Sequence, residues 1–268
     1  MSKKKKREIP IFDHPIFETH CHLDYLKERS TEETLALSCE KGINKFITIS
    51  VAPGNLDKVI EISKAHENVY CTQGLHPHEA KHWTSEVEQK ILNHSTFEKV
   101  VAIGEIGLDF HYNNSPKEKQ IEVFKRQLEI ATEKELPVVI HSRDADPETI
   151  EVLSEMAPQM KKKGVIHSFT SGPELAQTAI DLGFHLGFNG IITFKNAQAV
   201  RDIVTLTPLE RILLETDSPF LTPTPYRGME NGPQYLPFIA EKIAEIKEVS
   251  VDEVLVQAYK NSTSLFLS

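Results

Sequence analysis

Eight short apolar runs, each followed by a segment with helical spacing, constrain the fold of this 268-residue chain most strongly. The runs are rich in β-branched residues, and they begin about one βα unit apart. They span Ile16–His22, Lys45–Val51, Val69–His76, Val100–Asp109, Pro137–His141, Gly164–Phe169, His185–Ile192 and Arg211–Asp217. Eight parallel strands in a chain of this length predict an α/β protein with a (β/α)8 TIM barrel. An open doubly wound sheet is the competing topology.

Prolines mark the starts of several predicted helices. Ser115 is expected to cap a helix that has Pro116 at its first position, and Pro147 and Pro173 are expected to open two more. Two further helical patterns follow the last strand and would close the barrel, at 236–248 and 250–260.

The net charge is unevenly distributed. The protein carries −9 overall, but residues 1–8 hold five basic side chains and one acidic one, so the remainder carries −13. We expect residues 1–14, with the basic run Lys3–Arg7, to be a disordered, solvated tail and residues 15–268 to form a single domain. The acidic body argues against a broad phosphate-binding surface, so metal ions and a few local donors would have to hold any nucleic acid.

The composition also bears on location. No apolar run approaches the ~18 residues of a transmembrane helix, and no segment resembles the core of a signal peptide. The three cysteines, Cys21, Cys39 and Cys71, are too few and too unevenly spaced for a disulfide framework or a zinc ribbon. We therefore expect a cytoplasmic protein with no membrane contact and no obligate protein partner.

Side chains that commonly bind metals close five of the apolar runs. They are His20 and His22, Glu105, His141, His167 and Asp217. The carboxyl ends of parallel barrel strands meet on one face, so these side chains are expected to converge on a metal centre. An open sheet would not bring them to one point.

The His20-Cys21-His22 segment is the sharpest local signal. Side chains alternate along a strand, so the two imidazoles share one face and Cys21 points the other way. Two nitrogens on one face can chelate a single divalent ion. For a histidine taken alone, a buried structural role is the usual alternative.

Two carboxylates complete the candidate centre. Glycines on either side of Glu105 allow close approach of backbone and ligands, and its two oxygens could bridge two ions. Asp217 could bind metal, orient a water or accept the proton of that water. Glu215 shares the face of Asp217, and we favour Asp217 because it lies nearer the carboxyl end of the strand.

A second set of residues is expected to face substrate. His76 and His78 follow the third run, and Lys195, Arg143 and Arg227 could hold phosphate oxygens. A plain surface role explains each of these five residues about as well.

Six segments in order along the chain carry a family resemblance. They are Thr19–Asp24, Gly74–Glu79, Gly104–Asp109, His141–Arg143, His167–Phe169 and Glu215–Pro219. Together they resemble the motifs of the TatD family of metal-dependent deoxyribonucleases, within the amidohydrolase superfamily. The resemblance extends from about residue 15 to the end. It implies a (β/α)8 barrel, two divalent ions (Mg, Mn, Zn or Ni) and hydrolysis of DNA phosphodiesters, commonly by exonuclease action from a 3′ end, single strands included.

The resemblance also implies roles for particular residues. His20, His22, Glu105 and Asp217 would hold one ion, and Glu105, His141 and His167 would hold the second. Glu105 and Asp217 would be the catalytic carboxylates. His76, His78 and Arg143 would lie beside the substrate phosphate.

The sequence departs from the family pattern in three places. Glu18 stands where the family usually has Asp, and the extra methylene could change how the neighbouring histidines are supported. The segment Phe169–Gly172 differs slightly from the commoner pattern. Met229 and Glu230 stand where relatives often carry basic residues.

Two other functions compete with a DNA phosphodiesterase. One is an amidohydrolase that cleaves a C–N or ester bond of a small substrate. Barrels of that group often bridge their metals with a carboxylated lysine on the fourth strand, where this chain has Glu105. The other is an inactive barrel that serves as a binding module, and the complete ligand set argues against it.

Overall fold

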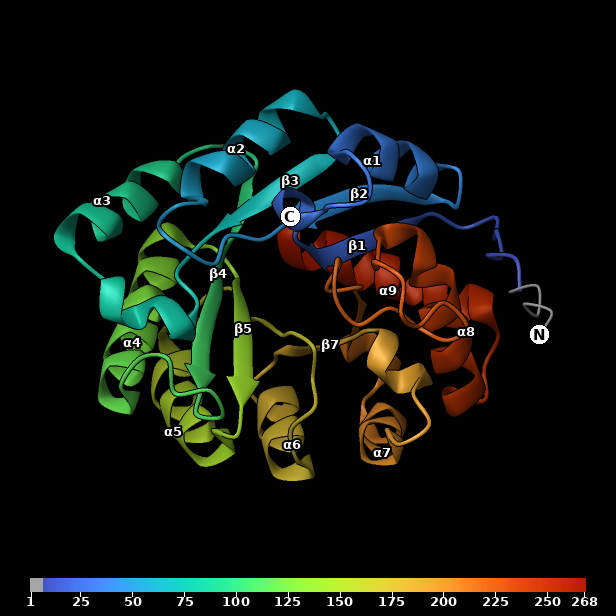
Figure 1. Ribbon diagram of the computed structural model, residues 1–268. Helices are drawn as coiled ribbons and strands as arrows, with labels where there is room; N and C mark the ends of the chain where they lie inside the picture. Colours follow the sequence, from blue (N-terminus) through green and yellow to red (C-terminus); the bar gives the residue numbers. More distant parts are fainter. Residues whose placement is uncertain (1–6) are drawn as a thin grey trace.

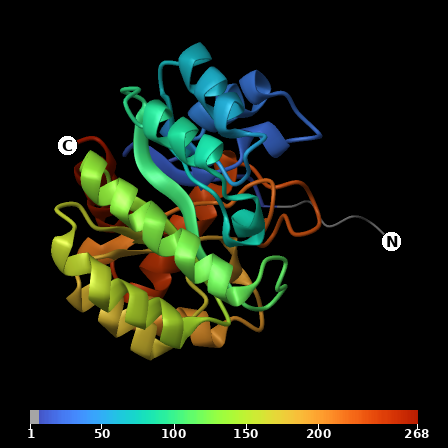
Figure 2. The same ribbon diagram turned by 90° about the vertical axis from the view of Figure 1, so that its left-hand side faces the viewer.

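The computed structural model describes residues 7–268, in which eight parallel strands are surrounded by helices (Figures 1 and 2). The strands are hydrogen-bonded to one another in chain order. They span β1 (Ile16–Cys21), β2 (Ile43–Thr48), β3 (Val69–Gln73), β4 (Val100–Asp109), β5 (Val138–Arg143), β6 (Gly164–Ile166), β7 (His185–Phe188) and β8 (Ile212–Leu214). The α-helices span α1 (Thr31–Cys39), α2 (Leu56–Ala65), α3 (Ser85–His94), α4 (Lys117–Lys134), α5 (Asp146–Met156), α6 (Pro173–Asp181), α7 (Gln198–Leu206), α8 (Leu236–Lys247) and α9 (Val251–Phe266). The predicted (β/α)8 barrel is confirmed.

Apolar packing closes one end of this barrel. Phe17, Ile47, Val101 and Leu213 belong to a buried cluster on the strands, and this cluster continues into Phe266 at the end of α9. The rings of Phe17 and Phe266 lie 6.4 Å apart between centroids. A larger cluster joins the strands to the surrounding helices, and Figure 2 shows α4 lying across the outside of the barrel. The carboxyl ends of the strands are therefore left as the face on which a site can open.

The strands end earlier than their apolar runs. β3, β6 and β8 stop before His76, His167 and Asp217 are reached. Ser168 and Asp217 have φ angles of 46° and 55°, values that side-chain-bearing residues rarely adopt and that turn the chain out of the sheet. Three candidate site residues thus lie on turns just beyond their strands.

Two further predicted strand boundaries are wrong. The run expected at Lys45–Val51 pairs as Ile43–Thr48, and the end of the run His185–Ile192 forms a 3-10 helix, η4 (Gly190–Thr193). In the second case the side chain of Asn189 accepts a hydrogen bond from the backbone N–H of Ile191 and so caps η4.

The predicted cap of α4 is also wrong. The helix begins at Lys117 after Pro116, whose backbone is extended, and no side chain caps it. The Ser115 hydroxyl instead donates to the carbonyl of His78 and accepts from the N–H of Lys81. Ser115 therefore binds the 3-10 helix η2 (Pro77–His82). The expected openings of α5 and α6 by prolines are confirmed.

The barrel closes between β1 and β8 through a short seam. The N–H of His22 donates to the carbonyl of Ser218 at 2.7 Å, and the N–H of Asp217 donates to the carbonyl of His20 at 2.9 Å. A side chain contributes as well, because the buried Glu18 carboxylate accepts from Thr216 across the seam. This seam sets the distance between two strands that carry candidate metal ligands.

The N-terminal segment from residue 7 to residue 14 has no helix or strand. The Arg7 guanidinium pairs with the carboxylate of Glu241 on α8, and the Arg7 carbonyl accepts from the Tyr226 hydroxyl at 2.9 Å. The rest of the basic run, Lys3–Lys6, lies outside the described residues. In the described part of the chain, no helix is both long enough and apolar enough to span a bilayer.

Candidate metal centre

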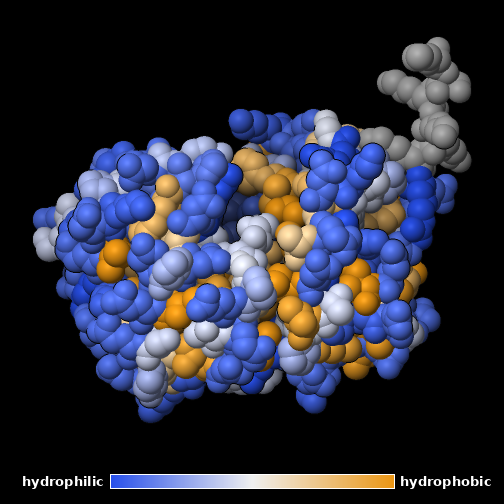
Figure 3. All heavy atoms as spheres, turned by 90° about the horizontal axis from the view of Figure 1, so that it is seen from below, coloured by the Kyte–Doolittle hydropathy of each residue, from blue (hydrophilic) through white to orange (hydrophobic). Residues whose placement is uncertain are grey.

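A cavity of about 650 Å³ opens at the carboxyl ends of the strands. Figure 3 views the face toward which β4 and β5 point, and it shows a hollow with hydrophobic side chains along its border. Eight predicted site residues line the cavity: His22, His76, His78, Glu105, His141, Arg143, His167 and Asp217. His20 is fully buried against two of them, Glu105 and Asp217. The six predicted metal ligands thus come together, although they are up to 197 positions apart in the chain.

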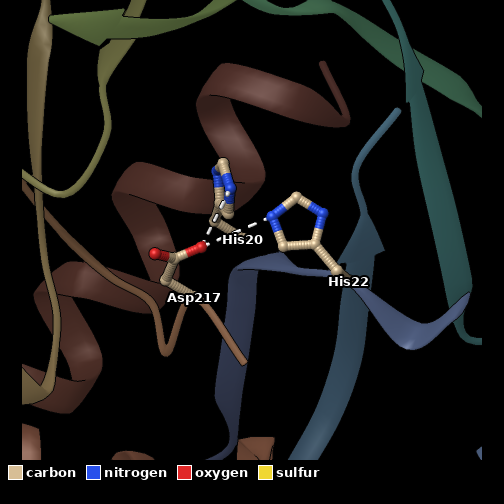
Figure 4. A group of neighbouring side chains, drawn as sticks. All are labelled: His20, His22 and Asp217. Carbon is tan, nitrogen blue, oxygen red and sulfur yellow. Dashed lines mark ion pairs between the residues drawn. The ribbon is translucent and has the colours of Figure 1, made fainter. Parts of the chain in front are cut away.

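One potential ligand group lies at the seam between β1 and β8 (Figure 4). The Nε2 atoms of His20 and His22 lie 3.6 and 3.4 Å from the same oxygen, Oδ1 of Asp217. Figure 4 shows the other Asp217 oxygen pointing away from both imidazoles. As predicted, Cys21 takes no part, since its thiol is buried and donates to the carbonyl of Ile47.

Glu105 is the central carboxylate of the cavity. Its Oε1 lies 2.9 Å from Nε2 of His167, 3.1 Å from Nδ1 of His141 and 3.4 Å from Nε2 of His76. Its Oε2 lies 3.5 Å from Nε2 of His20. Glu105 therefore belongs to two further potential ligand groups, one with His20 and His167 and one with His76 and His141.

A glycine makes the approach of β4 to β5 possible. Gly107 has a φ of 132°, and a β-carbon added there would lie 2.0 Å from the carbonyl oxygen of His141. No other residue fits that position without moving one strand. The prediction that the glycines near Glu105 allow a close approach of the backbone is thus confirmed for Gly107, which lies against His141 of β5.

The geometry suits metal ions better than direct hydrogen bonds. Two ligand atoms that bind one ion at ~2.1 Å lie roughly 3 to 3.5 Å apart, and most contacts around Glu105 and Asp217 fall in or close to that range, from 3.1 to 3.6 Å. Neither ring nitrogen of His20 has a hydrogen-bond partner among residues 7–268. A fully buried imidazole without a partner is costly, and an ion between His20 and the two carboxylates would supply one.

The electrostatics favour cations in the same place. Burial alone would raise the pKa of Glu105, but His167 and His76 hold that pKa well below its usual range. Burial likewise opposes the ionisation of Asp217, and the imidazoles of His22 and His20 lower its pKa. Both carboxylates are therefore anions at neutral pH. The pKa of His76 falls to about 4 because of burial, so this imidazole is neutral and available as a ligand.

Sequence reasoning gave no role to Asp109, although it supports the cavity. Its Oδ2 lies 3.1 Å from Nε2 of His141 and 2.9 Å from Nε2 of His78, so it fixes one candidate ligand and one candidate substrate-facing residue. Asp109 is four residues beyond Glu105 on β4, an even spacing that places both on one face of the strand. This even spacing is the feature of the sequence from which a role for Asp109 beside Glu105 could have been predicted.

Glu215 has a different position from Asp217. It is fully buried, accepts from the N–H of Ser168 and the side chain of Asn189, and lies 3.8 Å from Nδ1 of His167. Glu215 therefore orients the His167 segment from behind and does not line the cavity.

Two predicted substrate-facing residues lie apart from this set. Neither Lys195 nor Arg227 lines the cavity, and the Arg227 guanidinium lies over the ring of Phe194, 3.7 Å from its centroid. Glu230 accepts from the N–H groups of Lys27 and Glu28 at 2.8 and 3.0 Å. Its carboxylate thus joins two loops beside the cavity.

A parallel barrel whose strand ends bring buried imidazoles and carboxylates together is the architecture of a metal-dependent hydrolase. The comparisons with known proteins agree. Residues 17–267 match the model of the family described as TatD related DNase, so the chain belongs to the TatD family.

Individual relatives cover nearly the whole chain. The metal-dependent hydrolase YabD of Bacillus subtilis is 36% identical over 252 residues, which are 94% of this chain and 98% of that protein. The 3′-5′ ssDNA/RNA exonuclease TatD of Erwinia amylovora is 34% identical over 85% of this chain and 90% of its own length. The crystal structure of YJJV, a TatD homologue from Escherichia coli K12, superposes with a TM-score of 0.89 at 28% identity and covers 94% and 98% of the two chains.

Proposed function

We propose that this hydrolase cleaves phosphodiester bonds of DNA, as an exonuclease acting from the 3′ end of single strands, with two divalent ions per subunit. The observation that carries the proposal is the position of Glu105, which belongs to two potential ligand groups in a cavity that an exposed arginine also lines. A centre for two cations beside a guanidinium suits an anionic phosphodiester better than a neutral amide. The name of the Erwinia relative agrees with this substrate.

The proposed ligands are the predicted six, with His76 added by the geometry. Divalent ions held there would polarise a phosphoryl oxygen and make water a better nucleophile at neutral pH. Glu105 would help to hold both ions, since it belongs to two potential ligand groups. Asp217 would bind through Oδ1, beside His20 and His22, and its second oxygen would accept the proton of the attacking water.

Substrate contacts are proposed for the cavity wall. Arg143 and His78 line the cavity and would donate to the phosphate, and Asp109 would hold His78 in place. Lys195 and Arg227 lie outside the lining, so they would contact only parts of a strand that extend beyond the cavity. We also propose a cytoplasmic location, because Cys21, Cys39 and Cys71 are all unpaired.

Digestion of end-labelled oligonucleotides tests the reaction. Single- and double-stranded DNA, labelled at the 5′ or the 3′ end, is incubated with purified protein and each of Mg²⁺, Mn²⁺, Zn²⁺ and Ni²⁺. We expect stepwise shortening of single strands from the 3′ end. A parallel assay with a nitrophenyl phosphodiester and a cyclic amide separates phosphoester from C–N hydrolysis. Cleavage of the amide alone would replace the proposed function with the amidohydrolase alternative.

Two substitutions separate the metal centre from the substrate wall. Glu105→Gln should abolish hydrolysis, because an amide cannot supply the anionic bridge. Arg143→Ala should mainly raise KM, since it removes a donor to the substrate. Lys58→Ala, which removes an exposed cation on α2 away from the cavity lining, is the matched control. Equal, mild losses in Glu105→Gln and Arg143→Ala would contradict the assignment.

A further inference from the structure

One aromatic side chain at the cavity is unusually exposed. Phe220 lies just beyond β8 and is 51% exposed, one of four large hydrophobic residues of the described chain that are more than half exposed. It lines the main cavity and also a second cavity of about 570 Å³, and Tyr25 is shared between the two in the same way. An exposed aromatic ring at the edge of a cavity offers a large flat surface on which a planar group can stack.

Hydrogen bonds hold the backbone of Phe220 in place, although its ring is exposed. Its N–H donates to the carbonyl of Asp217 at 2.9 Å, and its own carbonyl accepts from the side chain of Asn231. The same amide of Asn231 donates to the carbonyl of Thr216 at 3.0 Å. A ring on a fixed backbone loses little conformational entropy when a ligand covers it.

The ring of Phe220 borders the potential ligand group at the seam. It meets the ring of His22 edge-on, with 6.2 Å between centroids, while Tyr25 stacks on His22 at 5.3 Å with 17° between the planes. A planar group on the Phe220 ring would therefore lie next to a phosphate held at His22 and Asp217.

Tyr112 is the other exposed aromatic residue of the cavity, and side chains of the protein itself already contact its ring. Its ring is 57% exposed, but the guanidinium of Arg143 lies over it at 4.8 Å and His78 meets it edge-on at 5.6 Å. Tyr112 thus holds Arg143 in place, whereas the ring of Phe220 has only the edge contact with His22 among the described aromatic residues.

We propose that Phe220 is the stacking platform for an unpaired nucleobase at the 3′ end of the substrate, with Tyr25 forming the opposite wall of that subsite. The inference rests on the proposed nuclease function and names the substrate group that the site selects. Every nucleobase has a π-face, so stacking accepts any base but requires one that is not already stacked in a duplex. The subsite would therefore favour single-stranded ends without reading sequence.

The test compares Phe220→Ala with wild type on two single-stranded oligonucleotides, one normal and one with abasic sugars at the last two 3′ positions. Stacking contributes roughly 1 to 3 kcal/mol per base, so KM for the normal strand should rise roughly 5- to 150-fold in the variant. The rise should be much smaller on the abasic strand, which has no base to lose. Phe220→Trp should keep the low KM. Leu206→Ala removes another exposed apolar side chain, at the end of α7, and is the matched control.

A second measurement does not depend on hydrolysis. An oligonucleotide with 2-aminopurine at its 3′ end should lose fluorescence on binding wild type, because stacking quenches this base, and should keep it on Phe220→Ala. Equal KM changes on both strands, or quenching that survives Phe220→Ala in a folded variant with normal metal binding, would overturn the stacking proposal. Failure of wild type to cleave any oligonucleotide would instead overturn the proposed function, and quenching would still decide the subsite.

Discussion

Glu18 and Glu105 are both buried carboxylates near the seam, yet their surroundings differ. Glu18 Oε1 accepts from the N–H groups of His20 and Thr216 at 3.0 Å each, and Oε2 accepts from the Thr216 hydroxyl at 2.6 Å. All three donors are neutral, so burial prevails and raises the pKa of Glu18 to about 8. Glu105 is surrounded by imidazoles, which lower its pKa. The same residue type is thus used once as a structural link and once as a candidate ligand.

The structural link predicts a loss of stability. Glu18→Ala would leave the buried N–H groups of His20 and Thr216 without acceptors, which should lower the free energy of unfolding by on the order of 3 kcal/mol. Urea denaturation with metal removed measures this loss. Thr216→Val removes only the hydroxyl bond and should cost about 1 kcal/mol. A Glu18→Ala variant as stable as Thr216→Val would show that the carboxylate does not join the two strands.

At the scale of elements, the first residue of β7 is a half-buried histidine. His185 pairs in register with Val165 of β6, and its Nδ1 is buried without a hydrogen-bond partner among the described residues. Burial, with Arg211 nearby, lowers the pKa of His185 to about 4. The start of β7 is at the opposite end of the strand from the cavity, so metal binding should not disturb this effect.

This lowered pKa predicts an acid sensitivity of the fold. The unfolded chain binds a proton at His185 near pH 6.5 and the folded chain only near pH 4, so stability is full above pH 6.5 and falls as the pH drops toward 4. The contribution is on the order of 2 kcal/mol. His185→Gln should flatten the stability profile between pH 6.5 and 4, measured by urea denaturation at each pH. Replacement of the exposed His82 serves as the control, and parallel profiles for wild type and His185→Gln would refute the prediction.

The elements also show what the sequence could and could not predict. Apolar runs identified all eight strands because a parallel barrel strand is buried on both faces. The ends of the strands were harder to predict. His167 and Asp217 continue the apolar runs in the sequence, but they lie on turns where the chain has already left the sheet. The prediction that Ser115 caps α4 was wrong because its hydroxyl forms hydrogen bonds with η2 instead.

The residues of the candidate site could be predicted where a side chain that commonly binds metals lies at or near the carboxyl end of a predicted strand. His20, His22 and Glu105 follow from residue type and strand position alone. The place of Phe220 does not, because its exposure depends on how the chain folds after β8. The distance of Lys195 and Arg227 from the cavity was hidden for the same reason, since loops set where these cations point.

At the scale of the whole molecule, the potential ligand groups draw on residues at the ends of β1, β3, β4, β5, β6 and β8. An ion bound there would join strands that are widely separated in sequence. Because the unfolded chain has no such assembled site, divalent ions should bind mainly the folded state and stabilise it.

We therefore expect the melting temperature to depend on metal. At an ion concentration 100 times its Kd, stabilisation should be about 2.7 kcal/mol for one site, or roughly 5 to 10 °C in a chain of this size. Calorimetry of chelator-treated protein, titrated with Mn²⁺, measures the rise, which should continue with concentration. His141→Ala should reduce it, and His66→Ala, remote from the cavity, should not. A melting temperature unaffected by saturating metal would show that the folded protein binds the ion no more tightly than the unfolded chain does, and would contradict an assembled metal centre.

The candidate ligands and the walls around them come from different parts of the architecture. The ligands stand on the strands or within a few residues of their ends, while Tyr25, Tyr112 and Phe220 stand on the connections that follow β1, β4 and β8. Connections of this kind tolerate substitution and insertion far better than barrel strands do. Libraries of variants confined to these three connections should therefore change which substrates the protein accepts, while the candidate metal ligands on the strands stay the same.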